Sequence, residues 1–81
     1  MKTYILIQAM AQTDPMELVR WVGAVPGVER VEAVTGPYDL IAEAHSDDAT
    51  GLLGAIADLS SVLRAIDAPV VGVRDREPAA A

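Results

Sequence analysis

Apolar residues recur along the chain with two alternating spacings. Four stretches, residues 4–10, 28–35, 38–46 and 62–67, are rich in Val, Ile, Leu and Ala and are typical of β-strands. Between the first and second stretch, and between the third and fourth, apolar residues follow the spacing of one face of an α-helix. The pattern therefore predicts the order strand, helix, strand, strand, helix, strand.

Polar residues mark the two ends of the first helix. Asp14 precedes Pro15, and Glu17 stands in the capping-box position, which is the composition of a helix N-terminus. Pro26-Gly27 ends the helix, because neither residue continues it well. Trp21 lies beside the apolar face of this helix. We predict that it packs at the rim of the core; the alternative is an oligomer contact.

The segment 45-HSDD-48 holds the single histidine beside a hydroxyl and two carboxylates, groups that also occur in metal sites and catalytic triads. Consecutive residues of a strand point to opposite faces, so these side chains do not converge. We interpret the segment as the end of a strand followed by the N-cap of the second helix, at Asp47 or Asp48. Gly51 and Gly54 lie in that helix, and each weakens it by ~1 kcal/mol relative to Ala.

The two halves of the chain resemble each other. Residues 4–30 align with residues 38–64, and the matches include Tyr4 with Tyr38, Leu6 with Leu40, Asp14 with Asp48 and Arg30 with Arg64. Tandem βαβ-like units predict an α+β fold of the ferredoxin-like βαββαβ type. Its four-stranded antiparallel sheet would have the order 4-1-3-2, with both helices on one face.

The two central strands of that sheet carry consecutive apolar pairs, Leu6-Ile7 and Leu40-Ile41. Both faces of the sheet are therefore apolar at its centre, although the helices cover only one of them. The chain has 81 residues, of which 52% are hydrophobic, more than a small core readily buries. We predict a homodimer that packs sheet to sheet and forms an α+β barrel.

Composition excludes several classes of function. Twelve acidic against six basic residues give a net charge of -6, which disfavours binding to nucleic acid or to an anionic membrane. The chain has no cysteine, no glycine-rich phosphate motif and no apolar stretch of about 20 residues. We predict no cofactor, no metal, no membrane span and a cytoplasmic location. Residues 1–74 would form one domain, and 75–81 a flexible tail; residues 70–73 could pair with their own sheet or a neighbour's.

The stretch 36-GPYD-39 admits two interpretations. Gly and Pro suit a tight turn, Asp caps turns, and Tyr38 matches Tyr4 of the repeat, so the stretch could simply close a hairpin. Alternatively, backbone N–H groups, a phenol and a carboxylate on one loop could hold a zwitterion. Asp39 stands where the first half has Ile5, which is the departure that the repeat does not explain.

The segment 25-VPGVERVEAVTGPYDLIAEAHSDD-48 resembles the effector-binding RAM domain of the Lrp/AsnC (leucine-responsive/asparagine) transcriptional regulators. The resemblance covers residues 4 to 73. Those regulators also carry an N-terminal helix-turn-helix domain; this sequence opens directly on a strand, so we expect a stand-alone copy of the module.

The resemblance implies dimers that assemble into an octameric or decameric ring and bind an amino acid between dimers. It places Thr35, Gly36, Pro37, Tyr38 and Asp39 at the ligand. Asp39 would meet the α-ammonium group, and loop N–H groups near Gly36 and Tyr38 the α-carboxylate. A second wall would come from Ala65, Ile66 and Asp67 of a neighbouring dimer, where relatives often have Thr-x-Thr.

Three functions follow in order of preference. The first is a non-enzymatic module that senses a small amino acid and modulates transcriptional regulation. The second is an interaction protein without a ligand, which co-assembles with full-length Lrp/AsnC regulators. The third is a small dimeric α+β barrel enzyme, for which only His45 and Trp21 are available as functional side chains.

Overall fold

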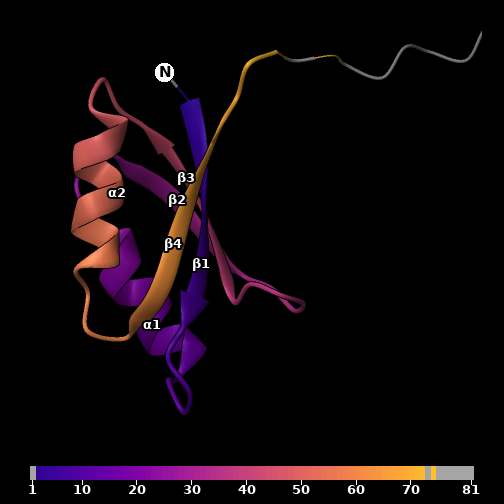
Figure 1. The fold of residues 1–81 in the computed structure, drawn as a ribbon, viewed down its shortest axis with the longest axis vertical. Helices are drawn as coiled ribbons and strands as arrows, with labels where there is room; N and C mark the ends of the chain where they lie inside the picture. Colours follow the sequence, from indigo (N-terminus) through magenta and orange to yellow (C-terminus); the bar gives the residue numbers. More distant parts are fainter. Residues whose placement is uncertain (1, 73, 75–81) are drawn as a thin grey trace, which may run out of the picture.

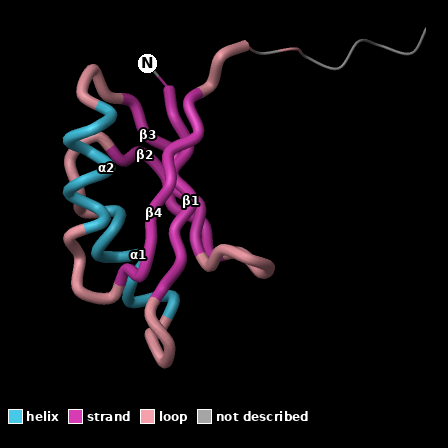
Figure 2. The backbone as a smooth tube through the Cα atoms, viewed as in Figure 1, coloured by secondary structure: helices cyan, strands magenta, loops and turns pink. Residues whose placement is uncertain are grey.

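The computed structural model describes residues 2–72 and 74. Its elements are β1 (Lys2–Ala9), α1 (Pro15–Gly23), β2 (Val28–Ala33), β3 (Leu40–His45), α2 (Ala49–Ala57) and β4 (Val62–Pro69). The predicted βαββαβ order is confirmed (Figure 2). The tail predicted for residues 75–81 lies outside the described residues, as does residue 73 of the segment 70–73.

The four strands form one sheet in the order β2-β3-β1-β4, and each neighbouring pair is antiparallel. This is the predicted order 4-1-3-2 read from the opposite edge, so the prediction is confirmed. Both helices lie against one side of the sheet (Figure 1). The other side, called the open face below, is left uncovered by the helices.

The core lies between the helices and the sheet. Alternate residues of the central strands point into it, and residues of both helices meet them there: Ile5, Ile7, Leu40 and Ala42 from the strands, and Leu18, Val22, Leu52 and Ile56 from the helices. Shortening a buried leucine or isoleucine of this core to alanine costs about 2–5 kcal/mol. The core therefore holds β1 and β3 in a fixed register, and with them the loops at their ends.

Aspartate side chains cap both helices. The Asp14 carboxylate accepts a hydrogen bond from the Met16 N–H at 3.0 Å, and the Asp48 carboxylate accepts one from the Gly51 N–H at 2.9 Å. Asp48 is therefore the cap of α2. A Cβ atom on Gly51 would collide with the Asp48 carboxylate. The glycine that weakens the helix by propensity thus makes room for its cap.

β3 begins at Leu40, so the prediction that this strand opens at Tyr38 is wrong. Tyr38 and Asp39 belong to the loop after β2, whereas Tyr4, the counterpart of Tyr38 in the repeat, lies within β1. The two halves of the structure therefore differ at residues 38 and 39, where the loop between β2 and β3 projects from the sheet.

β4 extends through Pro69, although the sequence predicted its end at Asp67. β4 is an edge strand, where a residue without an N–H group is tolerated. The Val70 N–H donates to the Lys2 carbonyl at 3.2 Å, so residue 70 still contacts its own sheet.

Candidate functional site

The five residues predicted to bind a ligand all lie on the loop of residues 34–39 between β2 and β3. This loop projects from one end of the sheet, away from the side that carries the helices (Figure 1). Thr35, Gly36 and Pro37 are exposed, and Tyr38 and Asp39 are half-buried. Gly36 has a φ of 123°, which side chains rarely adopt, and open space surrounds the position of its missing Cβ. Backbone conformation, not packing, requires the glycine.

Asp39 is joined to β1 by both its backbone and its side chain. Its N–H donates to the Ile7 carbonyl at 2.9 Å, and its carboxylate Oδ2 accepts from the Ala9 N–H at 2.8 Å. The Val34 N–H donates to the Asp39 carbonyl at 2.9 Å and closes the loop. Because β3 starts opposite Ile7, no strand reaches the Ala9 N–H from that side, and the carboxylate takes the place of a strand carbonyl.

The acid at position 39 therefore has a structural role, as the turn interpretation expected, but its hydrogen-bond partner lies on β1 and not within the turn. The sequence carries no signal for this partner, because the lack of a β3 partner for Ala9 becomes visible only once the register is known. The second carboxylate oxygen, Oδ1, accepts no hydrogen bond within the described chain. Asp39 is thus positioned by one oxygen and can offer the other to a cation.

The loop also contains backbone N–H groups without acceptors. Those of Val34 and Asp39 are used inside the chain, and Pro37 has none. The N–H groups of Thr35, Gly36 and Tyr38 donate to no acceptor among the described residues. A carboxylate with a free oxygen and several unused N–H donors therefore occur on one short loop.

Tyr38 contacts a residue that sequence analysis did not assign to the site. The guanidinium carbon of Arg64 on β4 lies 5.9 Å from the centroid of the Tyr38 ring, within the range of a cation–π contact. Arg64 lies opposite Gln8 of β1, so it extends from the open face. Arg30, its counterpart in the repeat, forms an ion pair with Glu32 at 2.6 Å. The sequence repeat singled out Arg64, but only the strand register brings it to the loop.

The open face has an apolar centre. Leu6 lies between Ile41 of β3 and Ile66 of β4, and all three point away from the helices. The prediction that both faces of the central strands are apolar is confirmed, since Ile7 and Leu40 lie on the buried side. Ile66 is 37% exposed, which is high for a residue of its size.

Charged residues border this apolar centre on one side. Lys2 forms an ion pair with Glu43 at 2.9 Å, and its ammonium lies 5.2 Å from the centroid of the Tyr4 ring. The hydrogen bond to Glu43, with a smaller contribution from Tyr4, raises the pKa of Lys2 above its ordinary value. Tyr4, Ile41 and Glu43, with Arg30 and Glu32, line a hollow of about 250 Å³ on this face. An apolar centre with a charged rim is typical of a protein–protein interface.

The second-wall residues do not share one face. Ile66 lies on the open face beside Leu6, whereas Ala65 and Asp67 lie opposite Ile7 and Ile5 and so are on the helix side. Ala65 and Asp67 are half-buried. Their role at a neighbouring dimer stays a prediction.

The segment 45-HSDD-48 adopts the expected structure of a strand end and a helix cap. His45 is exposed at the end of β3, and the Ser46 hydroxyl accepts a hydrogen bond from the Asp48 N–H at 3.0 Å. Among residues 2–72 and 74, no group of His, Asp and Glu side chains is arranged to hold a metal ion.

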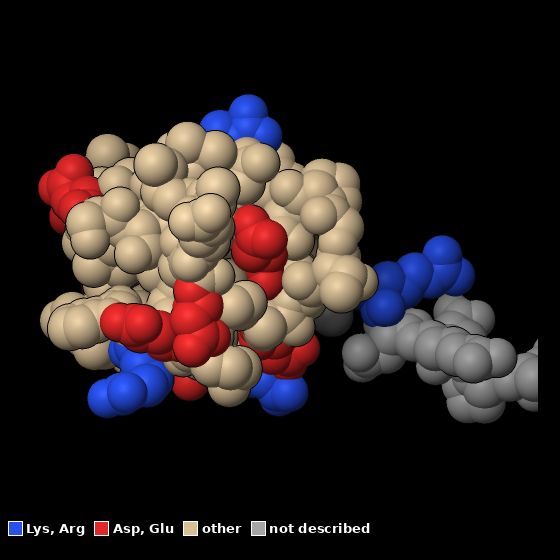
Figure 3. All heavy atoms as spheres, turned by 90° about the horizontal axis from the view of Figure 1, so that it is seen from below, with Lys and Arg blue, Asp and Glu red and all other residues tan. Residues whose placement is uncertain are grey.

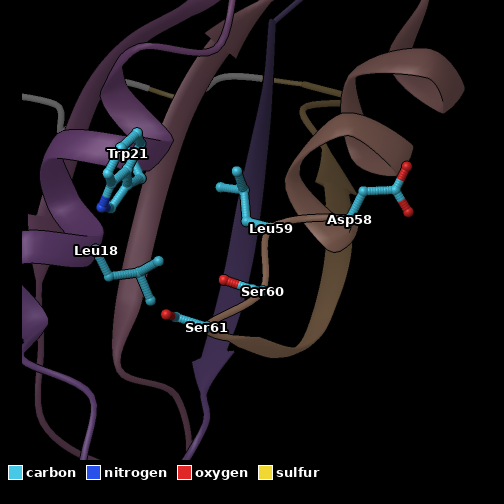
Figure 4. Close-up of a pocket in the computed structure, with 6 residues that line it drawn as sticks. All are labelled: Leu18, Trp21, Asp58, Leu59, Ser60 and Ser61. Atoms are coloured by element: carbon cyan, nitrogen blue, oxygen red, sulfur yellow. The ribbon is translucent and has the colours of Figure 1, made fainter.

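Another hollow, of about 270 Å³, lies on the helix side. Leu18 and Trp21 of α1 face Leu59, Ser60 and Ser61 of the α2–β4 connection across it, and the Asp58 carboxylate points away (Figure 4). Trp21 is 58% exposed, so it lies at the edge of the core. This hollow shares no residue with the loop of residues 34–39.

On the face of the molecule drawn in Figure 3, the described residues form no cluster of basic side chains that would suit a polyanion. Seen from one end of the molecule, single basic side chains lie at the edge of the outline, while acidic side chains reach its middle (Figure 3). None of the described helices is long and apolar enough to span a membrane.

Comparison with known proteins places the fold. No family model matches the sequence, and no curated protein matches it. A solved structure of the Thermus thermophilus protein TTHA0845 is similar, with a TM-score of 0.77, 26% identity, and coverage of 93% of this chain and 98% of that one.

Two further solved structures with the same fold are longer proteins. Escherichia coli AsnC matches with a TM-score of 0.75 and 16% identity, over 95% of this chain and 54% of its own. The Neisseria meningitidis transcriptional regulator NMB0573, solved as its L-Met complex, matches with a TM-score of 0.71 and 20% identity, over 93% of this chain and 52% of its own. The chain is thus structurally similar to Lrp/AsnC family proteins and spans about half the length of these two.

Proposed function

We propose that this chain is a non-enzymatic module of the Lrp/AsnC RAM type, which binds a small amino acid and modulates transcriptional regulation. Its fold matches that of AsnC and of a regulator solved with L-Met bound. The observation that carries the proposal is the loop of residues 34–39. It combines a carboxylate oxygen without a hydrogen bond and three N–H groups without described acceptors.

These groups complement a zwitterion. The ammonium group of the ligand binds Oδ1 of Asp39, and its carboxylate binds N–H groups of Thr35, Gly36 or Tyr38, while Pro37 fixes the loop. Hydrogen bonds in which one partner is charged are among the stronger ones in proteins. Both charges of an α-amino acid are thereby neutralised at one loop, and its side chain is left to contact a neighbouring surface.

We propose that this neighbouring surface comes from further copies of the chain. The apolar centre of the open face, formed by Leu6, Ile41 and Ile66, packs against the same face of a second copy and forms an α+β barrel. Dimers then assemble into an octamer or decamer, and the segment Ala65, Ile66 and Asp67 of a neighbouring dimer completes the ligand site. The exposure of Thr35, Gly36 and Pro37 supports this arrangement, because one chain alone leaves the loop open.

A melting screen with the twenty common L-amino acids, combined with light scattering, tests the proposal. A ligand at 100 times its Kd adds ~2.7 kcal/mol to the free energy of unfolding, which is readily measured. At least one amino acid should raise the melting temperature or change the assembly. If none does either, the sensing function is refuted.

Asp39→Asn is the variant that separates the roles of this residue. An asparagine oxygen can still accept the hydrogen bond from Ala9, while the charge that would bind the ammonium group is gone. The response to the ligand should be lost with the fold and dimer intact. Asp39→Ala is a poorer test, because it leaves the Ala9 N–H without its acceptor, at a cost of about 1–3 kcal/mol. An unchanged response in Asp39→Asn would refute the role of Asp39.

The second candidate is an interaction protein that co-assembles with full-length Lrp/AsnC regulators and binds no small molecule. It is favoured by one observation: the shared fold covers 95% of this chain but about half of AsnC. Mixing the chain with a full-length regulator from the same cell should then give mixed oligomers, with no change in melting on addition of any amino acid.

A further inference from the structure

The open face carries a guanidinium group that no acid of the described chain neutralises. Among residues 2–72 and 74, the ion pairs on this face join Lys2 to Glu43 and Arg30 to Glu32. Arg64 takes part in neither, although the chain has twice as many acidic as basic residues. The guanidinium carbon of Arg64 instead lies 5.9 Å from the centroid of the Tyr38 ring.

The ring of Tyr38 holds the positive charge of Arg64 near the loop of residues 34–39. A guanidinium group stacks on an aromatic face through its planar, weakly hydrated surface, and its edge stays free to form two parallel hydrogen bonds with a carboxylate. Tyr38 comes from the loop of residues 34–39 and Arg64 from β4, so the contact brings β4 to the proposed ligand site. A cation that is oriented but unpaired is suited to bind an anion.

The strand register places Arg64 and Asp39 on the two sides of β1. Arg64 pairs with Gln8, and the Asp39 carboxylate binds the N–H of the next residue, Ala9, from the β3 side. Adjacent strands lie about 4.8 Å apart, so β3 and β4, on either side of β1, are about 10 Å apart. The Tyr38 contact brings the Arg64 guanidinium toward the loop that carries Asp39, so one α-amino acid, with its ammonium and carboxylate on the same carbon, can contact both side chains.

We infer that Arg64 binds the α-carboxylate of the ligand and, with Asp39, makes the site specific for free α-amino acids over their amides and esters. The inference rests on the proposed sensing function and adds to it a specificity-determining residue. Loop N–H groups alone donate hydrogen bonds to a neutral carbonyl as readily as to a carboxylate. A guanidinium group distinguishes the two, because its hydrogen bonds are strengthened by the negative charge.

The experiment compares each ligand with its own carboxamide. Isothermal titration is run with the amino acid that gives the largest melting shift and with its carboxamide. Wild-type protein should bind the acid at least tenfold more tightly than the amide. Arg64→Gln should weaken binding of the acid about 10- to 100-fold, the effect of losing a hydrogen bond to a charged group, and leave the amide nearly unchanged.

Two further variants keep the test decisive. Arg64→Lys keeps the charge but loses the planar donor pair, so its affinity for the acid should be intermediate. Arg20→Gln removes an exposed arginine from the last turn of α1, away from the loop, and should bind like the wild type. If the wild type binds amide and acid equally, or if Arg64→Gln keeps the preference for the acid, the role of Arg64 is overturned while sensing stands. If no amino acid changes melting or assembly, both proposals fall.

Discussion

Asp39 serves the fold with one carboxylate oxygen and leaves the other available for the proposed ligand. Oδ2 accepts the Ala9 N–H that no strand reaches, and Oδ1 stays free of hydrogen bonds within the described chain. Sequence reasoning treated the two roles as alternatives, a turn residue or a binding residue. The register of β1 against β3 makes them compatible, since the structural bond fixes the side chain before any ligand arrives.

Gly36 is the second residue in the loop whose identity the backbone dictates. Its φ of 123° is unfavourable for any side chain, and its Cβ position is open, so Gly36→Ala should destabilise the fold through strain alone, by roughly 1–2 kcal/mol. Gly54→Ala is the matched control, because it adds the same methyl group to open space inside α2 and should stabilise by ~1 kcal/mol. Urea unfolding measures both. Equal effects of the two substitutions would contradict the strain at position 36.

At the scale of elements, local pattern was enough to predict which segments form strands and helices, but not where β3 begins. The spacing of apolar residues involves only neighbours in the chain, so it can be read directly from the sequence. The start of β3 is defined by its pairing with β1, which is distant in the chain, and the Asp39 carboxylate just before that start accepts from the Ala9 N–H. The contact of Arg64 with Tyr38 likewise depends on the strand order, which places β4 beside β1.

The N-terminus of α2 offers a test of coupling within one element. Asp48→Ala should cost about 1 kcal/mol by removing the cap on the Gly51 N–H. Gly51→Ala usually stabilises a helix by a similar amount, yet here its methyl group displaces the Asp48 carboxylate. In the wild-type background it should therefore give no gain, and in the Asp48→Ala background it should stabilise. A double-mutant cycle measured by urea unfolding reports this coupling; purely additive effects would show that the cap and the glycine are independent.

At the scale of the whole molecule, the open face is the apolar surface that a single chain does not bury. The helices leave Leu6, Ile41 and Ile66 without a covering layer, and a charged rim borders them. Packing two such faces would bury apolar area and leave the charged residues at the edge of the interface. Like charges placed opposite each other would disfavour some orientations of the partner and so favour others. The loop of residues 34–39 lies at the end of this face, so the proposed interface and the proposed ligand site share the same side of the molecule.

Ile66→Lys tests the assembly without disturbing the core. Ile66 is 37% exposed in the single chain, so a lysine there should leave the fold intact while placing an unpaired charge in the centre of the proposed interface. The variant should sediment as a monomer at concentrations where the wild type sediments as a dimer or larger. Met16→Lys, 63% exposed on α1, is the control. The helices lie on the other side of the sheet, away from the open face, so this variant should assemble normally (Figure 1). A wild-type protein that stays monomeric, or an Ile66→Lys variant that assembles like the wild type, would refute packing through the open face. Because the proposed ligand site includes a neighbouring dimer, the monomeric variant should also lose the melting response to amino acids, although Asp39 and Arg64 are unchanged.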